Sequence, residues 1–236
     1  MKGIIFSRRR EDYFYLRIVF FAALCYNSYM ITGISTRCLN HFVETEECLS
    51  LIGRSSAEVC DVYLRTFYEY RPEFAEKCAQ NLSGVKAYSV RVNPDNFERQ
   101  LFSRSRRVRG DGFYWLDQLL RSAQIFGAEN YSFGLKRDEV ENWDGYIGEI
   151  RAFCARYGVI LCTLEDDAEK SPLPYTVYLN DSTGVRAHAY TDGCDGGFAL
   201  AIKSLKASGF DGTVILNAAL ADIAAAESFF KAVKKQ

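Results

Sequence analysis

The stretch LKASGFDGTVILN, residues 205–217, contains one repeat of the pattern that decides the fold. Gly209 lies where a helix should end, because glycine is the residue most often found just beyond a helix C-terminus. A short turn follows, and Thr213–Leu216 is an apolar run of strand length. A helix joined by a tight turn to a buried strand is typical of α/β proteins, in which helices cover parallel strands.

The same alternation runs from Met30 to Glu165. Apolar runs of strand length alternate with segments of helical spacing, and glycines lie where the helices should end. The expected strands are 30–36, 57–64, 85–92, 130–135 and 159–165, and the expected helices are 42–53, 71–84, 111–127 and 143–158. No G-x-G-x-x-G follows these strands, which favours a barrel over a dinucleotide-binding sheet.

The pattern changes after Glu165. Two of the four prolines follow closely, and no segment before residue 198 is long enough for a helix. The remaining elements are expected to be a strand at 176–181, a loop at 182–197, a helix at 198–209, a strand at 212–216 and a helix at 221–235. We therefore predict an α/β fold of the TIM type for residues 30–236. It should be an incomplete barrel of about seven parallel strands, with the missing unit between Glu165 and Thr176.

The composition is that of an ordinary globular protein, with 48% hydrophobic and 25% charged residues. The 29 basic and 30 acidic residues give a net charge of −1, which argues against a general nucleic-acid-binding surface. The eight cysteines include no C-x-x-C pair, so no structural zinc site is predicted. Scattered, reduced thiols indicate a reducing compartment, and we expect a cytoplasmic protein.

Residues 1–29 form an N-terminal extension to the predicted barrel. Within them Ile18–Leu24 is apolar but too short to cross a bilayer, since a spanning helix needs about 20 residues. Two interpretations stay open. The segment is either an extension upstream of a natural start at Met30 or a signal-like or anchoring segment, because a basic stretch precedes the apolar run.

Four stretches carry strand-end motifs: VYLRTFYEYRPEFAE at 62–76, SVRVNPDNFERQLFSR at 89–104, RYGVILCTLED at 156–166, and LNDSTGVRAHAYTDGCDGGFALAIKSLKASGFDGTVILN at 179–217. In this order and at this spacing they resemble strands of the xylose isomerase-like TIM barrels, the sugar phosphate isomerase and epimerase group. The first three resemble the second, third and fifth strands. The last resembles the seventh strand, its loop and the eighth strand.

The resemblance implies an active site at the C-terminal ends of the barrel strands. Members of the group usually bind one divalent metal, such as Mn, Mg or Zn, through Glu, Asp, His and Glu from strands five to eight. The metal holds adjacent sugar oxygens and stabilises negative charge while a proton or hydride moves between neighbouring carbons. Carboxylates then act as acid and base.

Only part of this ligand set has a counterpart here. Glu165 matches the fifth-strand Glu, whereas the sixth-strand Asp has none, because 166–180 is too short for the roughly 30 residues of a helix–strand–helix passage. The seventh-strand His falls on Tyr178, with Asp181 just beyond it, and the eighth-strand Glu falls on Asn217. An amide lacks the charge that a divalent cation prefers. We therefore expect a weak or absent metal site at Glu165, and we expect Asn217→Asp or Asn217→Glu to strengthen Mn²⁺ binding.

A second alignment takes AHAYTD, residues 187–192, as the seventh strand and makes His188 the metal ligand. The spacing of Asp181 from the glycine-rich loop fits the first alignment better. In that case His188 is a polar loop residue.

Further candidates lie at other predicted strand ends. The expected substrate-binding residues are Asp61, Arg91, Lys136, Tyr178 and Asn217. Arg91 and Lys136 would form an anion-binding pair for a phosphate or a carboxylate, since Arg can bind such groups through two nitrogens. The same cations would keep Glu165 ionised by lowering its pKa.

The resemblance therefore implies an isomerase or epimerase that acts on a sugar or a sugar phosphate. Glu165 is the expected centre of proton transfer, with Asp181 as a second catalytic carboxylate. The alternative is a non-catalytic relative that has lost the metal site and binds a small anionic ligand or a partner. No nucleic-acid partner is expected, and no membrane unless residues 1–29 anchor the chain. Oligomerisation stays open.

A chain that begins at Met30 should fold like the full chain, because the first strand pattern begins there. Circular dichroism and thermal unfolding of the shortened chain test this expectation. Loss of soluble expression on truncation would mean that the extension is part of the core.

Overall fold

The structure, a computed structural model, describes residues 31–40, 43–164, 175–180, 184–189, 213–217 and 224. Its strands are β1 Ile31–Ser35, β2 Val59–Leu64, β3 Lys86–Val92, β4 Asn130–Ser132, β5 Ile160–Leu164, β6 Tyr175–Asn180, β7 Gly184–Ala189 and β8 Thr213–Leu216. The α-helices are α2 Thr45–Gly53, α3 Pro72–Cys78, α4 Arg106–Phe126 and α5 Trp143–Ala155. Short 3-10 helices lie at η1 Thr36–Cys38, η2 Ala79–Leu82, η3 Glu98–Phe102 and η4 Arg137–Glu139.

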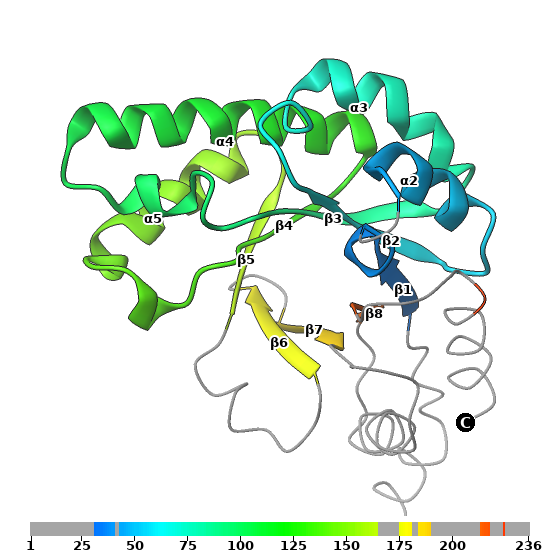
Figure 1. The fold of residues 1–236 in the computed structure, drawn as a ribbon. Helices are drawn as coiled ribbons and strands as arrows, with labels where there is room; N and C mark the ends of the chain where they lie inside the picture. The colour runs from blue at the N-terminus through cyan, green and yellow to red at the C-terminus, as the bar shows by residue number, and fades with distance from the viewer. Residues whose placement is uncertain are drawn as a thin grey trace, which may run out of the picture.

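The strands form one curled sheet in the order β7-β6-β5-β4-β3-β2-β1-β8. The six strands from β5 through β1 to β8 are parallel, and α2, α3 and α4 cover one side of them (Figure 1). β7, at one end of this order, lies beside β8 at the other end. The predicted incomplete α/β barrel is confirmed.

The strand that we expected as the next parallel member runs the other way. β6 pairs with β5 in antiparallel register, with Tyr178 opposite Leu164. Only residues 165–174 connect these neighbours, and a parallel connection needs a crossover of about a dozen residues or more. Within the described residues, six strands are therefore paired in parallel, where about seven parallel strands were expected.

The loop expected at 182–197 was partly wrong, because Gly184–Ala189 forms β7. It pairs with β6 as an antiparallel hairpin, with Asn180 opposite Gly184 and Thr176 opposite His188. Two antiparallel steps from β5 give β7 the direction of the parallel strands. The C-terminal end of β7, which includes His188, therefore lies at the same edge of the sheet as the C-terminal ends of β1–β5 and β8.

The two faces of the parallel strands carry different side chains. In β2, Cys60, Val62 and Leu64 belong to the main apolar core, which also contains residues of α2, α3, α4 and α5. The inner face has a small apolar cluster of Ile31, Val59, Tyr88 and Ile215 near the strand starts. Nearer the strand ends the inner face is polar. The barrel interior thus becomes polar at the edge where parallel strands end.

The helix boundaries follow local signals. α3 begins at Pro72, a favoured first-turn residue. α4 ends at Phe126 and is capped by Gly127, whose φ of 71° is left-handed and whose N–H donates to the carbonyl of Ala123. α4 begins at Arg106, five residues earlier than expected. Arginine has a good helix propensity without adding to the apolar spacing, so the first turn was not visible in the pattern.

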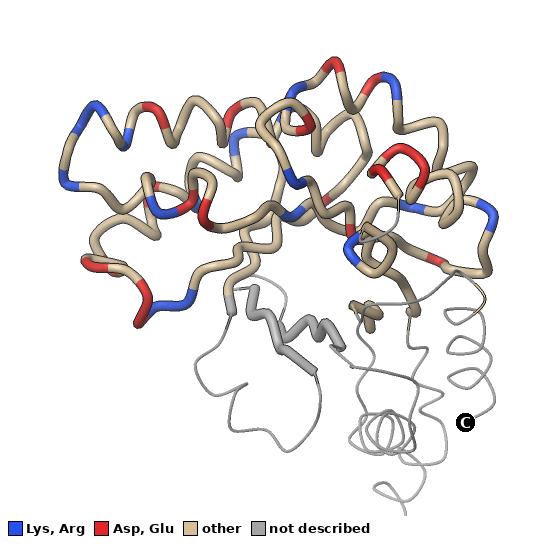
Figure 2. The backbone as a smooth tube through the Cα atoms, in the orientation of Figure 1, with Lys and Arg blue, Asp and Glu red and all other residues tan. Residues whose placement is uncertain are grey.

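Taken together, the described helices carry both basic and acidic positions, so the surface that they form has both signs of charge (Figure 2). No helix within the described residues is long and apolar enough to cross a membrane. Residues 1–29 lie outside the described part of the chain, and so do the helix expected at 198–209 and all of the helix expected at 221–235 except residue 224.

A buried carboxyl group holds the loops after β3 and β4 together. Glu98, in η3, is fully buried and accepts the Tyr131 hydroxyl at 2.5 Å and the Gly134 N–H at 3.0 Å. Burial raises the pKa of the Glu98 carboxyl to about 8, although the bonds from Tyr131 and Gly134 lower it. The rim of the half-barrel therefore contains a group that releases its proton only in weakly alkaline solution.

Glu98 should make folding stability fall as pH rises. Its pKa is raised in the folded state, so the unfolded chain loses this proton first, and stability decreases between about pH 4.5 and pH 8. Glu98→Gln cannot ionise and should remove a slope of up to about 1.4 kcal/mol per pH unit in that window. Urea unfolding from pH 5 to pH 8 measures this slope. Glu76→Gln on the exposed face of α3 is the control, and parallel curves for wild type and Glu98→Gln would contradict the assignment.

Candidate functional site

The polar inner face centres on Asp61 in the middle of β2. Its carboxylate is fully buried. Oδ2 accepts the Ser35 hydroxyl of β1 at 2.7 Å, and Oδ1 accepts the Ser89 hydroxyl of β3 at 2.6 Å. Asp61 thus binds side chains from both neighbouring strands, and it needs a positive charge nearby to remain ionised in this position.

Arg91 of β3 supplies that charge. Its Nη2 lies 3.1 Å from Asp61 Oδ2, and the two side chains are 6% and 1% exposed. The same nitrogen lies 3.3 Å from Ser35 Oγ and 3.3 Å from Asn217 Oδ1, just after β8. One guanidinium group therefore connects four adjacent strands, β8, β1, β2 and β3.

An irregularity in β3 sets this geometry. Cys60 is opposite Ala87, whereas Asp61 is opposite Ser89, so Tyr88 is an extra residue on β3. A β-bulge of this kind shifts the facing of the residues that follow it. As a result Ser89 and Arg91 lie on the same inner face as Asp61.

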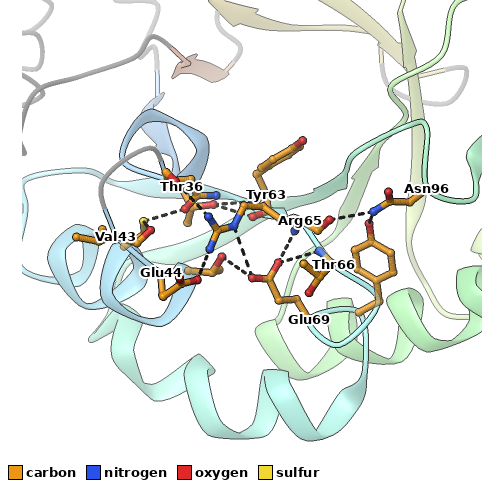
Figure 3. Close-up of polar contacts among 12 residues, drawn as sticks. Thr36, Val43, Glu44, Tyr63, Arg65, Thr66, Glu69 and Asn96 are labelled. Carbon is orange, nitrogen blue, oxygen red and sulfur yellow. Dashed lines mark hydrogen bonds and ion pairs between the residues drawn. The ribbon is translucent and has the colours of Figure 1, made fainter.

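The loops beyond these strands are fixed by a second network (Figure 3). Glu69 is buried and accepts the backbone N–H groups of Arg65 and Thr66, the latter at 3.2 Å, and the Thr45 hydroxyl at 3.0 Å. The Asn96 side chain donates to the Arg65 carbonyl at 2.9 Å. The loop after β2 is thus held by hydrogen bonds against α2 and against the loop after β3.

Arg65 connects the same rim to the loop after β1. Its guanidinium forms an ion pair with Glu44 and donates to the Asn40 carbonyl at 3.2 Å. Thr36 Oγ1 donates to the Tyr63 carbonyl at 3.1 Å and accepts the Tyr63 N–H at 2.9 Å. The segments that follow β1, β2 and β3 therefore form one connected structure.

Tyr63 lies between two arginines at this edge. The guanidinium carbon of Arg91 is 5.3 Å from the ring centre, and that of the exposed Arg37 is 5.6 Å away. Both distances are within the range of cation–π attraction. Burial raises the pKa of the Tyr63 hydroxyl, while Arg37 and Arg91 lower it. The arrangement places two positive groups beside one half-buried hydroxyl.

The structure brings together three of the predicted site residues, Asp61, Arg91 and Asn217. Lys136 lies half-buried in the loop after β4, where its backbone N–H donates to Glu139 at 2.8 Å. This loop leaves the same edge of the sheet, and the predicted pairing of Lys136 with Arg91 stays a prediction.

The other predicted residues are less fully placed. Glu165 and Asp181 lie outside the described residues. Tyr178 is opposite Leu164 in the register, but β6 runs antiparallel to β5. The chain that leads to Asp181 is therefore directed away from the edge where β1–β5 end. His188, the alternative ligand, belongs to β7, which has the direction of the parallel strands.

Sequence reasoning missed Ser35, Ser89, Tyr63 and Arg37. A signal for two of them was present, because polar residues recur at every second position of β2 and β3. Asp61 and Tyr63 alternate with core residues of β2, just as Ser89 and Arg91 do in β3. The bulge that brings these two pairs together has no signal of its own in the sequence.

The described part of the site does not fit a divalent metal. Among the residues that the structure describes, no group of three or more His, Cys, Asp or Glu could hold one. Asn217, at the position of the eighth-strand ligand, already accepts a hydrogen bond from the positively charged Arg91. Hard cations prefer several charged oxygens that are free of such partners.

No family model and no curated protein sequence matches the chain. Its structure, however, resembles solved structures. A D-tagatose 3-epimerase-like protein is 12% identical, with a TM-score of 0.57 over 87% of this chain and 97% of its own. A xylose isomerase domain protein from Planctomyces limnophilus is 10% identical, with a TM-score of 0.55 over 88% and 98%.

A third resemblance is to D-psicose 3-epimerase from Clostridium cellulolyticum H10, solved with D-tagatose. It is 11% identical, with a TM-score of 0.55 over 79% of this chain and 84% of the epimerase. At such low identity the similarity concerns the fold. The chain has the xylose isomerase-like TIM-barrel fold, and its described residues form six strands paired in parallel and one antiparallel hairpin.

Proposed function

We propose that the chain is a sugar isomerase or epimerase whose site lies at the C-terminal ends of β1, β2, β3 and β8. The observation that carries the proposal is the buried cluster of Asp61, Arg91 and Asn217. A connected set of buried polar groups is not needed to pack the interior of a barrel, so a function is the better explanation for it. TIM barrels carry out their chemistry at this edge, where the parallel strands end. The cluster offers oxygens and positively charged N–H groups to a polyhydroxylated ligand.

Glu165 is the proposed proton-transfer group, because it directly follows β5 and retains the charge of the corresponding residue in the group that the chain resembles. Asp181 receives no role in this proposal, since β6 leads away from the site edge. Arg91 and Lys136 are the proposed partners of an anionic substituent on the substrate, such as a phosphate or a carboxylate. A nearby cation would also keep the Glu165 carboxyl ionised and able to accept a proton.

Similar structures support sugars as the substrate class. One D-psicose 3-epimerase was solved in the presence of D-fructose, and a D-allulose 3-epimerase from Methylomonas sp. in complex with D-allulose. Both cover most of the present chain, at 11% and 9% identity and TM-scores of 0.53. These ligands are ketohexoses, so ketoses and their phosphates are the first compounds to test.

Proton transfer next to a carbonyl exchanges the substrate hydrogen with solvent. Incubation of ketohexoses, ketopentoses and their phosphates in deuterated water should therefore label one substrate, as measured by NMR or mass spectrometry. Glu165→Gln should lower the rate of labelling by about 10²-fold to 10⁴-fold, the usual contribution of one acid–base group. Glu129→Gln is the control, because Glu129 lies at the opposite edge in an exposed pair with Lys86. Equal labelling by wild type and Glu165→Gln would refute the assignment of Glu165.

A second function is supported by the contact between Arg91 and Asn217. Both groups already have protein partners, which suits a non-catalytic protein that binds a small anionic ligand at a preformed site. In that case a sugar phosphate should raise the melting temperature without any isotope exchange, because it binds only the folded state. Exchange with any member of the substrate panel would exclude this alternative.

A further inference from the structure

The amide at position 217 has a specific partner. Asn217 Oδ1 accepts a hydrogen bond from Arg91 Nη2 at 3.3 Å. The same nitrogen lies 3.1 Å from Asp61 Oδ2, inside the half-barrel and almost without solvent contact. In the group that the chain resembles, the residue at this strand end is a carboxylate that holds a metal.

We infer that the guanidinium of Arg91 is the permanent positive charge of this site and occupies the place where a divalent ion would lie against residue 217. The site would then be charged by a side chain and would need no exchangeable ion there. This inference concerns the charge of the site, and it applies whether the chain is a catalyst or a binding protein.

Distance is the first argument for mutual exclusion. A divalent ion binds an oxygen ligand at roughly 2.0–2.6 Å. An ion on Asn217 Oδ1 would therefore lie close to Arg91, whose Nη2 is 3.3 Å from the same oxygen. Like charges this close repel strongly in a buried environment, where the effective dielectric constant is low.

Ligand chemistry is the second argument. The carboxylate of this cluster, Asp61, already accepts hydrogen bonds from Ser35 and Arg91 on Oδ2 and from Ser89 on Oδ1. These contacts satisfy its charge and occupy both of its oxygens. A metal would have to displace the guanidinium to use them.

Charge balance explains why residue 217 is an amide. Arg91 and Asp61 together are neutral, and Asn217 accepts a hydrogen bond without adding charge. A carboxylate at 217 would leave a net negative charge in the buried cluster, which is unfavourable without a further cation. A neutral amide therefore balances the charge of a cluster that contains Arg91, just as a carboxylate would balance the charge of a metal.

This pairing changes the expected result of restoring the carboxylate. A Glu at position 217 would pair with the guanidinium of Arg91, so Asn217→Glu alone should gain no Mn²⁺ affinity. The double variant Arg91→Met/Asn217→Glu removes the cation and leaves Asp61 and the new carboxylate available to a metal. The expectation from the sequence, that the single change suffices, does not take account of the contact between Arg91 and residue 217.

Titration calorimetry with Mn²⁺ alone tests the inference, and it requires no knowledge of the substrate. The double variant should bind Mn²⁺ about tenfold or more tightly than wild type and Asn217→Glu, in line with the effects of groups around metal ligands. The control is Arg99→Met/Asn217→Glu, which removes an arginine that pairs with Asp95 on the surface. It should show no gain. A folded double variant without gain would overturn the inference.

Wild type provides a test that does not depend on the folding of the double variant. If Mn²⁺ binds wild type and Asn217→Ala weakens it, Asn217 is a metal ligand and the inference fails. Equal affinity in wild type and Asn217→Ala supports it. Arg91→Gln/Asn217→Glu is a second double variant that keeps a hydrogen-bond donor near Ser35, and circular dichroism checks that each variant is folded. Failure of the isotope-exchange experiment would leave these metal measurements unaffected.

Discussion

The buried ion pair between Asp61 and Arg91 is the interaction on which the rest of the site depends. Removing two charges from water costs several kcal/mol per ion, and good geometry with additional hydrogen bonds is needed to offset that cost. Ser35 of β1, Ser89 of β3 and Asn217, just after β8, supply these bonds. The pair is therefore favourable only when β8, β1, β2 and β3 are in register. Loss of either charge would leave the other uncompensated, at a cost of about 3–5 kcal/mol. The residues that form the candidate site therefore also hold the strands of the half-barrel together.

Two further buried carboxyl groups extend this arrangement to the rim. Glu69 holds the loop after β2 through backbone N–H groups, and Glu98 holds the loop after β4 through Tyr131 and Gly134. Their environments differ, because Arg65 lies 3.8 Å from Glu69, whereas the direct hydrogen-bond donors to Glu98 are neutral. Burial without a directly paired cation accounts for the raised pKa of Glu98. Hydrogen bonds connect the described parts of the rim after β1, β2 and β3, which reduces the free energy that a ligand bound there would lose to loop ordering.

The antiparallel hairpin determines which residues can join the site. A short connection after β5 reverses the chain, and β7 then returns in the direction of the parallel strands beside β8. The strand that closes the curl against β8 is therefore β7, although β6 comes first along the chain. The direction of a strand decides which of its ends carries residues to the active edge. The C-terminal end of β7 consequently lies at the edge where the parallel strands end, whereas that of β6 lies at the opposite edge.

The sequence by itself determined the fold class, the strands β1–β5 with the helices α2–α5 between them, and the strands β6 and β8. Periodic apolar patterns and helix-ending glycines are local properties of the chain, so they can be recognised without the structure. It also selected Asp61, Arg91 and Asn217 as candidate site residues, and the structure brings these three side chains together. The hairpin strand β7 was missed, although the turn residues at 180–184 and the alternation of 185–189 gave a local signal for it. Only the tertiary structure decided that Arg91 contacts Asn217, because these residues are 126 positions apart and meet through the closure of β8 on β1 and a bulge in β3. Register and bulges depend on contacts between strands, which no local pattern encodes, and those contacts made position 217 the partner of an arginine.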